Sequence, residues 1–181
     1  MPLPLVPLVL GKVAVAGAIA LYGHRLARGL QKPADYTHLE PAFVPAVHLE
    51  GFWKGEGVLQ GPLGKVGARL QGTLWGEWNN GQGRLMIRVA SDTGPTWEET
   101  LQIADSGSEL TLLDGTGKGT WSGNSLHLAR SLALPDALGG WGLHSDDWLH
   151  VLPSGTITQR SAWSKWGVPV GDLAMQWVRA V

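Results

Sequence analysis

Three short stretches rich in Trp, Val, Leu and Ile follow one another in residues 51–91, which read GFWKGEGVLQGPLGKVGARLQGTLWGEWNNGQGRLMIRVAS. Gly61-Pro62-Leu63-Gly64 and Asn79-Asn80-Gly81 separate the stretches, and residues of these types are the usual formers of tight turns. Alternation of apolar with polar or small residues is typical of strands that have one buried face. The pattern therefore predicts antiparallel strands at 51–60, 65–78 and 83–91, joined by hairpins.

The same pattern continues to the C-terminus. It predicts further strands at 96–105, 110–121, 125–134, 146–152, 156–166 and 171–179. No helical run of ten or more residues separates them, which excludes a parallel sheet with crossover helices. A meander of eight or nine strands has two unprotected edges unless the sheet closes. We therefore expect an all-β protein, an antiparallel up-and-down barrel of 8–9 strands over residues 51–181.

Composition excludes several classes of protein. The chain has 181 residues, 44% of them hydrophobic, with 14 Lys and Arg against 15 Asp and Glu and no cysteine. Disulfides, thiolate metal sites and cysteine nucleophiles are therefore excluded. The near-neutral balance argues against nucleic acid as a partner, because a nucleic-acid binder needs a basic footprint. The charge is unevenly distributed, since residues 1–33 hold four basic groups and no acid.

Residues 1–32 are predicted to be a hydrophobic N-terminal anchor helix that spans a membrane. Residues 3–22 are almost wholly apolar, and about 20 apolar residues cross a bilayer. A cleaved signal peptide and a hydrophobic helix packed on its own domain are the open alternatives. Basic residues on the C-terminal flank of the segment favour a single-pass bacterial inner-membrane protein with its barrel on the cytoplasmic face. Residues 33–50 contain three prolines and are expected to be an extended linker.

A family resemblance rests on three stretches, which are residues 145–152 (SDDWLHVL), 157–171 (ITQRSAWSKWGVPVG) and 52–57 (FWKGEG). Over residues 47–180 the chain resembles an uncharacterised bacterial lipocalin-like family, a domain of unknown function commonly found in lipoproteins. The resemblance implies a lipocalin-like barrel and a periplasmic location, although this chain lacks the cysteine that a lipoprotein needs. It also implies that Trp53 in the first strand and Arg179 in the last close the barrel by cation–π stacking.

The last hairpin holds the candidate site residues. A turn at residues 153–155 would set Trp148 beside Arg160 and Asp147 beside Ser161, with Lys165 and Trp166 further along. One interpretation is a structural network that holds the hairpin. The functional interpretation has Asp147, Arg160 and Lys165 recognising a polar or acidic headgroup at the barrel mouth.

No catalytic or metal-binding pattern is present in the sequence. The consecutive residues His144, Ser145 and Asp146 are of the types found in catalytic triads, but their side chains diverge along a strand. The six histidines have no metal-ligand spacing, so we expect neither metal nor cofactor. Residues 115–120 are interpreted as part of a bulged strand, and Glu98 and Glu99 as a solvated strand face. Ten Trp residues either fill the barrel or line a cavity in it.

We therefore expect a non-catalytic, membrane-tethered lipocalin-like protein that binds a lipid or another hydrophobic small molecule. The alternative is a structural accessory subunit of a membrane protein complex, in which the helix packs in the membrane and the barrel caps the complex. An enzymatic activity inside the barrel is the least supported option.

Overall fold

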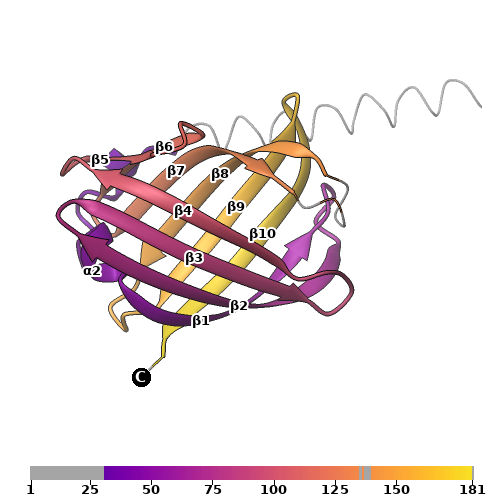
Figure 1. The fold of residues 1–181 in the computed structure, drawn as a ribbon, viewed down its shortest axis with the longest axis horizontal. Coiled ribbons are helices and arrows are strands. Elements are labelled where there is room, and N and C mark those ends of the chain that lie inside the picture. The colour runs from indigo at the N-terminus through magenta and orange to yellow at the C-terminus, as the bar shows by residue number, and fades with distance from the viewer. Residues whose placement is uncertain (1–30, 135, 137–139, 181) are drawn as a thin grey trace, which may run out of the picture. The chain divides into compact units, whose positions relative to one another are not determined.

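The computed structural model describes residues 31–134, 136 and 140–180. Two helical turns, η1 (Pro33–Tyr36) and α2 (Pro45–His48), precede ten strands (Figure 1). The strands are β1 Gly51–Gln60, β2 Val66–Asn79, β3 Gln82–Ser91, β4 Trp97–Asp105, β5 Glu109–Leu112, β6 Gly117–Ser122, β7 Ser125–Ala133, β8 Gly142–Val151, β9 Ile157–Lys165 and β10 Val168–Arg179.

The strands form one closed antiparallel barrel in which each strand pairs with its neighbours in the chain. The ring closes where β1 pairs with β10, in a register that sets Trp53 opposite Arg179. The predicted all-β, antiparallel, closed architecture is confirmed. Closure removes both edges of the sheet, which explains why so long a meander leaves no strand edge to aggregate.

The barrel has ten strands where the sequence predicted eight or nine, because residues 110–121 make two strands. The Asp114 carboxylate accepts hydrogen bonds from the backbone N–H of Thr116 at 2.9 Å and from its hydroxyl at 2.7 Å. Gly115 between them has φ +76°, a conformation that glycine adopts without strain. This tight turn separates β5 from β6, so the interpretation of residues 115–120 as a bulge was wrong.

In an up-and-down barrel, alternate connections lie at the same end. The connections 61–65, 92–96, 113–116, 134–141 and 166–167 therefore surround one end, which we call the mouth. The connections 80–81, 106–108, 123–124 and 152–156 surround the other end, which we call the plugged end. In Figure 1, α2 lies at the left beside the β2–β3 turn, and the β3–β4 turn lies at the right.

Residues 33–50, expected as an extended linker, instead cover the plugged end. Phe43 and Leu49 are 1% and 2% exposed and belong to the hydrophobic core. The backbone N–H of Phe43 donates to the carbonyl of Gly123 at 2.5 Å, which ties the segment to the β6–β7 turn. Phe43 and Leu49, which lie among prolines in the sequence, are therefore buried because their segment closes this end of the barrel.

In the barrel interior, residues with small side chains leave the space that large side chains fill. Trp177 of β10 is 3% exposed and lies opposite Gly55 of β1, whose other neighbour is Gly72 of β2. A β-carbon at Gly55 would lie 2.5 Å from the Trp177 ring, and one at Gly72 would lie 2.8 Å from it. Glycine is needed at both positions because the indole occupies the space that a side chain would take.

The predicted anchor helix lies in residues 1–32, of which 1–30 are outside the described residues. Among the residues described, no helix has both the length and the apolar character to cross a bilayer. The ring of strands and its core are complete within residues 33–180, which form one compact unit.

Candidate functional site

A pocket of about 40 Å³ lies inside the mouth half of the barrel. Three indoles contribute to its wall, Trp97 of β4, Trp163 of β9 and Trp177 of β10, together with Met175. Its polar lining includes Glu99, Arg130, Gln159 and Ser161. The volume is enough for about three water molecules, so the pocket as it stands admits only a small part of a ligand.

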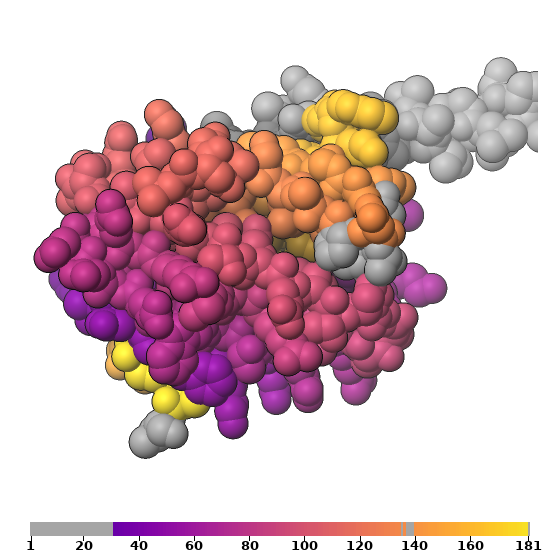
Figure 2. Space-filling view, in the orientation of Figure 1, coloured from indigo at the N-terminus to yellow at the C-terminus, as the bar shows by residue number. Residues whose placement is uncertain are grey.

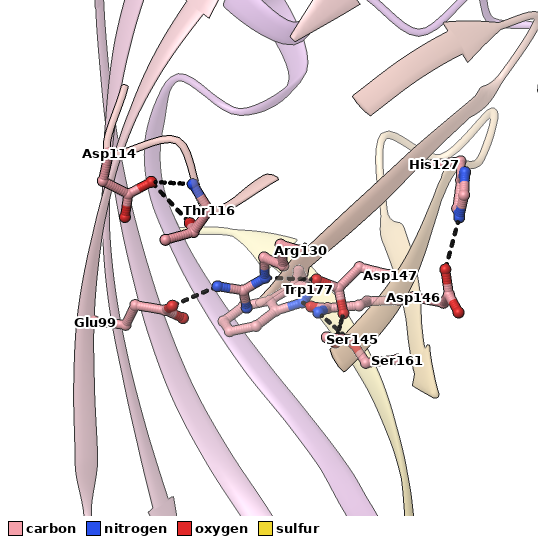
Figure 3. Close-up of polar contacts among 11 residues, drawn as sticks. Glu99, Asp114, Thr116, His127, Arg130, Ser145, Asp146, Asp147, Ser161 and Trp177 are labelled. Carbon is pink, nitrogen blue, oxygen red and sulfur yellow. Dashed lines mark hydrogen bonds and ion pairs between the residues drawn. The ribbon is translucent and has the colours of Figure 1, made fainter. Parts of the chain in front are cut away.

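Arg130 is the centre of a buried ion cluster that crosses the interior (Figure 3). Its Nε donates to the Asp147 carboxylate at 2.8 Å, and its Nη1 donates to the carboxylate of Glu99. The side chains of Arg130 and Asp147 are 9% and 3% exposed, whereas that of Glu99 is 22% exposed. Arg130 on β7 thus joins the neighbouring strand β8 to β4, which is separated from β7 by two strands in the ring.

Electrostatics keep Arg130 in its charged form. Burial lowers the pKa of Arg130, but the carboxylates of Asp147 and Glu99 raise it by more, so its pKa lies above the ordinary value. One cation faces two carboxylates, which gives the cluster a formal charge of −1. Arg130 is therefore already matched by carboxylates and offers no free cation to an anionic ligand group in the pocket.

Two sets of hydrogen bonds satisfy the polar groups of the cluster and of the pocket wall. The Ser145 hydroxyl donates to Asp147 at 2.7 Å. On the facing strands, the Trp177 indole N–H donates to Gln159 at 2.8 Å, and the Gln159 amide donates to the Ser161 hydroxyl at 3.0 Å. Within the described part of the chain, the indole N–H of Trp78 is the one buried side-chain polar atom without a hydrogen-bond partner. The polar atoms buried in the cluster are therefore satisfied, which is what permits charge in an apolar interior.

The candidate site residues predicted in the last hairpin lie at three different places in the structure, which are the barrel interior, its outer face and its mouth. The predicted register is present, with Asp147 opposite Ser161 and Trp148 opposite Arg160. Asp147 and Ser161 are each 2% exposed and face inward, whereas Arg160 is 59% exposed and approaches Asp172 at 4.0 Å. Asp147, Arg160 and Lys165 are thus not brought together as one headgroup clamp, and the cation beside Asp147 is Arg130.

Lys165 and Trp166 lie at the mouth. The Lys165 ammonium is 4.6 Å from the ring centroid of Trp141 and 4.8 Å from that of Trp166. Trp148 lies on the outer face, where it stacks on His127 with 4.6 Å between ring centroids. Trp148 and Arg160 are adjacent in register, but no cation–π contact joins them among those of the described residues.

Sequence reasoning missed Glu99, Arg130 and Gln159. The sequence signal that could have found Glu99 and Arg130 is the alternation of inward- and outward-facing residues along a strand. Arg130 lies on the same face of β7 as Leu128 and Leu132, and all three residues are buried. Glu99 shares its face with Trp97 and Leu101, so the interpretation of Glu99 as solvated was wrong. That interpretation does hold for Glu98, whose side chain is 71% exposed and pairs with Arg88.

Trp53 and Arg179 meet at the seam where the barrel closes. The Arg179 guanidinium carbon lies 4.6 Å from the Trp53 ring centroid, and its Nη2 donates to the carbonyl of Val47 at 2.8 Å. Trp53 is 2% exposed. The pair thus links β1, β10 and the segment that covers the plugged end, which is a structural role.

A second polar group lies on the outer face of β7 and β8. Asp146 contacts His127 at 3.3 Å and His144 at 3.6 Å. The hydrogen bond from His127 lowers the pKa of Asp146 against the opposing effect of burial, and the charge of His144 adds to the lowering. Ser145 points to the opposite side, toward Asp147, so these neighbours form no triad. The described residues contain no cluster of potential ligands that would hold a metal ion.

Fold and site together define a closed antiparallel β-barrel with a narrow pocket and a fully paired ion cluster inside it. The chain belongs to a family of proteins of unknown function, DUF3833, whose model matches residues 26–179. The prediction of an uncharacterised family is confirmed at that level. The match begins before residue 33, in agreement with the finding that residues 33–50 are part of the barrel's core.

The fold is similar to that of a protein of unknown function from the DUF3598 family of Nostoc punctiforme. The two have a TM-score of 0.58 and 13% sequence identity over 78% of this chain and 51% of the other. The chain therefore spans about half the length of that protein, and the likeness concerns the fold alone. No curated protein sequence matches the chain significantly.

Proposed function

We propose that the protein is a non-catalytic, lipocalin-like binding protein that takes the apolar chain of a lipid into its barrel through the mouth. The observation that carries this proposal is the pocket itself, whose lining combines three indoles and a thioether with the paired charges of Arg130 and Glu99. Indole and thioether side chains favour an apolar occupant. Arg130 is already paired with two carboxylates and offers little attraction to an anionic headgroup, so the chain enters first and the headgroup stays at the mouth.

The size of the pocket constrains how binding occurs. Pockets that enclose a whole drug-sized ligand measure roughly 300–1,000 Å³, far more than the 40 Å³ found here. Entry of several methylene groups therefore requires side chains to move. Met175 and Leu132 line the pocket, and both are flexible apolar side chains that change rotamer at low cost. The proposal thus predicts a structure of the complex in which the pocket is larger.

Two further parts of the proposal concern chemistry and location. The cluster holds Arg130 between two carboxylates, an arrangement that supplies neither a nucleophile nor an exposed base. Binding without catalysis is the function that this chemistry favours. Retention at the bacterial inner membrane by residues 1–32 completes the proposal, and it rests on the apolar sequence of that segment.

Photo-crosslinking tests the proposal on the full chain in lipid nanodiscs. The probe is a palmitate that carries a diazirine near the end of its chain. We expect crosslinks, mapped by mass spectrometry of peptides, on the β9 and β10 residues that line the pocket. Val89→Phe or Leu132→Phe fills the pocket and should reduce this labelling at least tenfold, whereas Val178→Phe on the outer face should leave it unchanged.

Two pocket variants are used because one of them can fail to fold, which near-ultraviolet circular dichroism detects. Labelling restricted to residues 1–32 or to the outer face of the barrel contradicts the proposal. So does labelling of the pocket strands that survives both substitutions in folded protein.

A further inference from the structure

The mouth carries bulky apolar side chains that are exposed to solvent. Trp166 in the β9–β10 turn is 92% exposed, and Leu63 in the β1–β2 turn is 88% exposed. Val66 and Val168 flank these tips and are 49% and 58% exposed, and Trp141 of the β7–β8 loop is 49% exposed. We call these five residues the apolar rim. Because β8, β9, β10, β1 and β2 are consecutive in the ring, the rim occupies one continuous arc of the mouth.

Trp166 also has an unfavourable backbone conformation. Its φ is +49°, and with Gly167 at +80° it forms the two-residue turn between β9 and β10. Such turns favour Asn, Asp or Gly, whereas a bulky residue at positive φ is a genuine outlier. The indole gains almost no burial in return, since it is 92% exposed. Among the described residues, the cation–π contact of Trp166 is with the Lys165 ammonium at 4.8 Å, and this contact leaves most of the indole open to a contact outside the barrel.

Charge distinguishes this arc from the rest of the mouth. The β1–β2 turn contributes Lys65 and the end of β9 contributes Lys165, against the one acid Asp136 among the described residues of the three connections on this arc. The turns on the opposite arc carry Asp92 and Asp114. Lys165 lies over both Trp141 and Trp166, which keeps a cation beside two indoles. Indoles accompanied by lysines are the side chains that anchor proteins at the interface of a bilayer with anionic lipids.

From these observations we infer that the apolar rim docks the barrel, mouth first, on the surface of a bilayer that contains anionic lipid. Trp166 and Leu63 enter the interface, while Lys65 and Lys165 contact lipid phosphates. In Figure 2 the yellow tip of the β9–β10 hairpin projects from the top of the molecule, as an inserting element must. The docked arc is at the same end as the pocket, so a lipid chain could pass from the bilayer to the barrel without crossing water.

The length of chain before the barrel permits this orientation. Ten residues, 23–32, separate the apolar stretch that ends at Tyr22 from Pro33. Ten extended residues span at most roughly 35 Å. A strand of ten to twelve residues tilted by about 40° rises roughly 25–30 Å along a barrel axis. The linker is therefore long enough to leave the mouth access to the bilayer, and a tether raises the effective concentration of the apolar rim at that surface.

Site-directed spin labelling of the full chain tests the docking proposal, and the absence of native cysteine makes it direct. One nitroxide is placed at Leu63→Cys in the rim, and a matched one at Ser154→Cys in the β8–β9 turn of the plugged end. The protein is reconstituted in vesicles of 70% phosphatidylcholine and 30% phosphatidylglycerol. We expect the label at position 63 to collide preferentially with oxygen, as labels in lipid do, and the label at 154 to collide preferentially with a water-soluble nickel chelate.

Substitution of the rim provides the second measurement. Trp166→Asn should reduce the lipid exposure of the label at position 63 at least threefold and should raise the melting temperature. Trp75→Asn, which removes an exposed indole from the outer face of β2, is the matched control and should change neither the lipid exposure nor, by more than a degree or two, the melting temperature.

Three results would overturn the proposal. The first is an aqueous environment for both labels on vesicles with anionic lipid. The second is a label at position 63 that is shielded from oxygen and from the chelate alike, which indicates a protein partner at the rim. The third is equal loss of lipid exposure in Trp166→Asn and Trp75→Asn. The docking proposal stands or falls independently of the crosslinking test, because a barrel can dock without admitting a lipid chain.

Discussion

Replacing Arg130 by Met tests whether the ion cluster is essential to the barrel. The substitution preserves an unbranched side chain but leaves Asp147, which is 3% exposed, without its cation. Breaking a buried ion pair from one side typically destabilises a protein by about 3–5 kcal/mol. Because Glu99 is 22% exposed, water can solvate it and its share of the loss is smaller.

The expected loss is large compared with the stability of a domain, which is about 5–15 kcal/mol. For a domain of this size it corresponds to a fall in melting temperature of roughly 10–20 °C. The assay is thermal unfolding of the full chain in a mild detergent, followed by near-ultraviolet circular dichroism. The matched control is Arg88→Met, because Arg88 pairs with Glu98 on the outer face with side chains 66% and 71% exposed. That variant should lose less than about 1 kcal/mol.

Removing every charge of the cluster distinguishes destabilisation by an unpaired buried charge from destabilisation by lost packing. The triple variant Arg130→Met, Asp147→Leu, Glu99→Gln leaves no unpaired ion, and replacing a whole buried ion cluster by apolar groups is often close to neutral. We expect it to recover most of the stability that Arg130→Met loses. Equal losses in Arg130→Met and Arg88→Met, or a triple variant less stable than Arg130→Met, would refute the reasoning.

Three further substitutions or conditions give expected outcomes. Gly55→Ala forces a methyl group against the Trp177 ring and should destabilise the barrel by about 1–3 kcal/mol, measured by thermal unfolding. Trp166→Asn relieves a bulky residue at positive φ and should stabilise the protein by roughly 0.5–1 kcal/mol in the same assay. Burial lowers the pKa of His150, so the folded state binds fewer protons than the unfolded state. Stability should therefore be complete above the unfolded pKa of about 6.5 and should decrease as the pH falls below it.

Each of these outcomes has a control. Gly142→Ala places a methyl group in open space at ordinary φ and should change stability by less than about 0.5 kcal/mol. If it costs as much as Gly55→Ala, the Trp177 contact is not the cause. A Trp166→Asn variant that melts below the wild type would rule out backbone strain at the β9–β10 turn. His150→Gln should flatten the fall in melting temperature between pH 7.5 and 5.5, and an unchanged slope would exclude His150 as its source.

The local sequence was sufficient to predict which residues pair across a hairpin. The turn at residues 153–155 has a fixed length, which is why the pairing of Asp147 with Ser161 could be predicted from sequence and is present in the structure. Alternation likewise predicted that the side chains of Ser145 and Asp146 diverge, and they do. The β5–β6 turn was missed because its signal, Asp114 bonded to Thr116 around Gly115, lies within a stretch of otherwise good strand formers.

The site could not be predicted in the same way, because it depends on contacts between distant strands. Arg130 and Glu99 are 31 residues apart and meet only because the sheet closes. From local sequence, a charged residue is interpreted as exposed even where alternation places it inward. Its burial is tolerable only because it pairs with an opposite charge across the barrel. The covering of the plugged end was missed for a similar reason. Phe43 and Leu49 lie in a proline-containing segment, and their burial depends on the cavity that ten strands enclose.

The central claim, that a lipid chain enters the pocket, is tested most directly by the methyl resonances of methionine. The chain has three methionines, Met1, Met86 and Met175, and Met175 lines the pocket whereas Met86 is not part of its lining. The measurement is a ¹H–¹³C spectrum of the full chain, labelled at the methionine methyls, in nanodiscs with and without added palmitate. We expect the Met175 resonance to shift while that of Met86 stays in place. An unchanged Met175 resonance at saturating palmitate would contradict it.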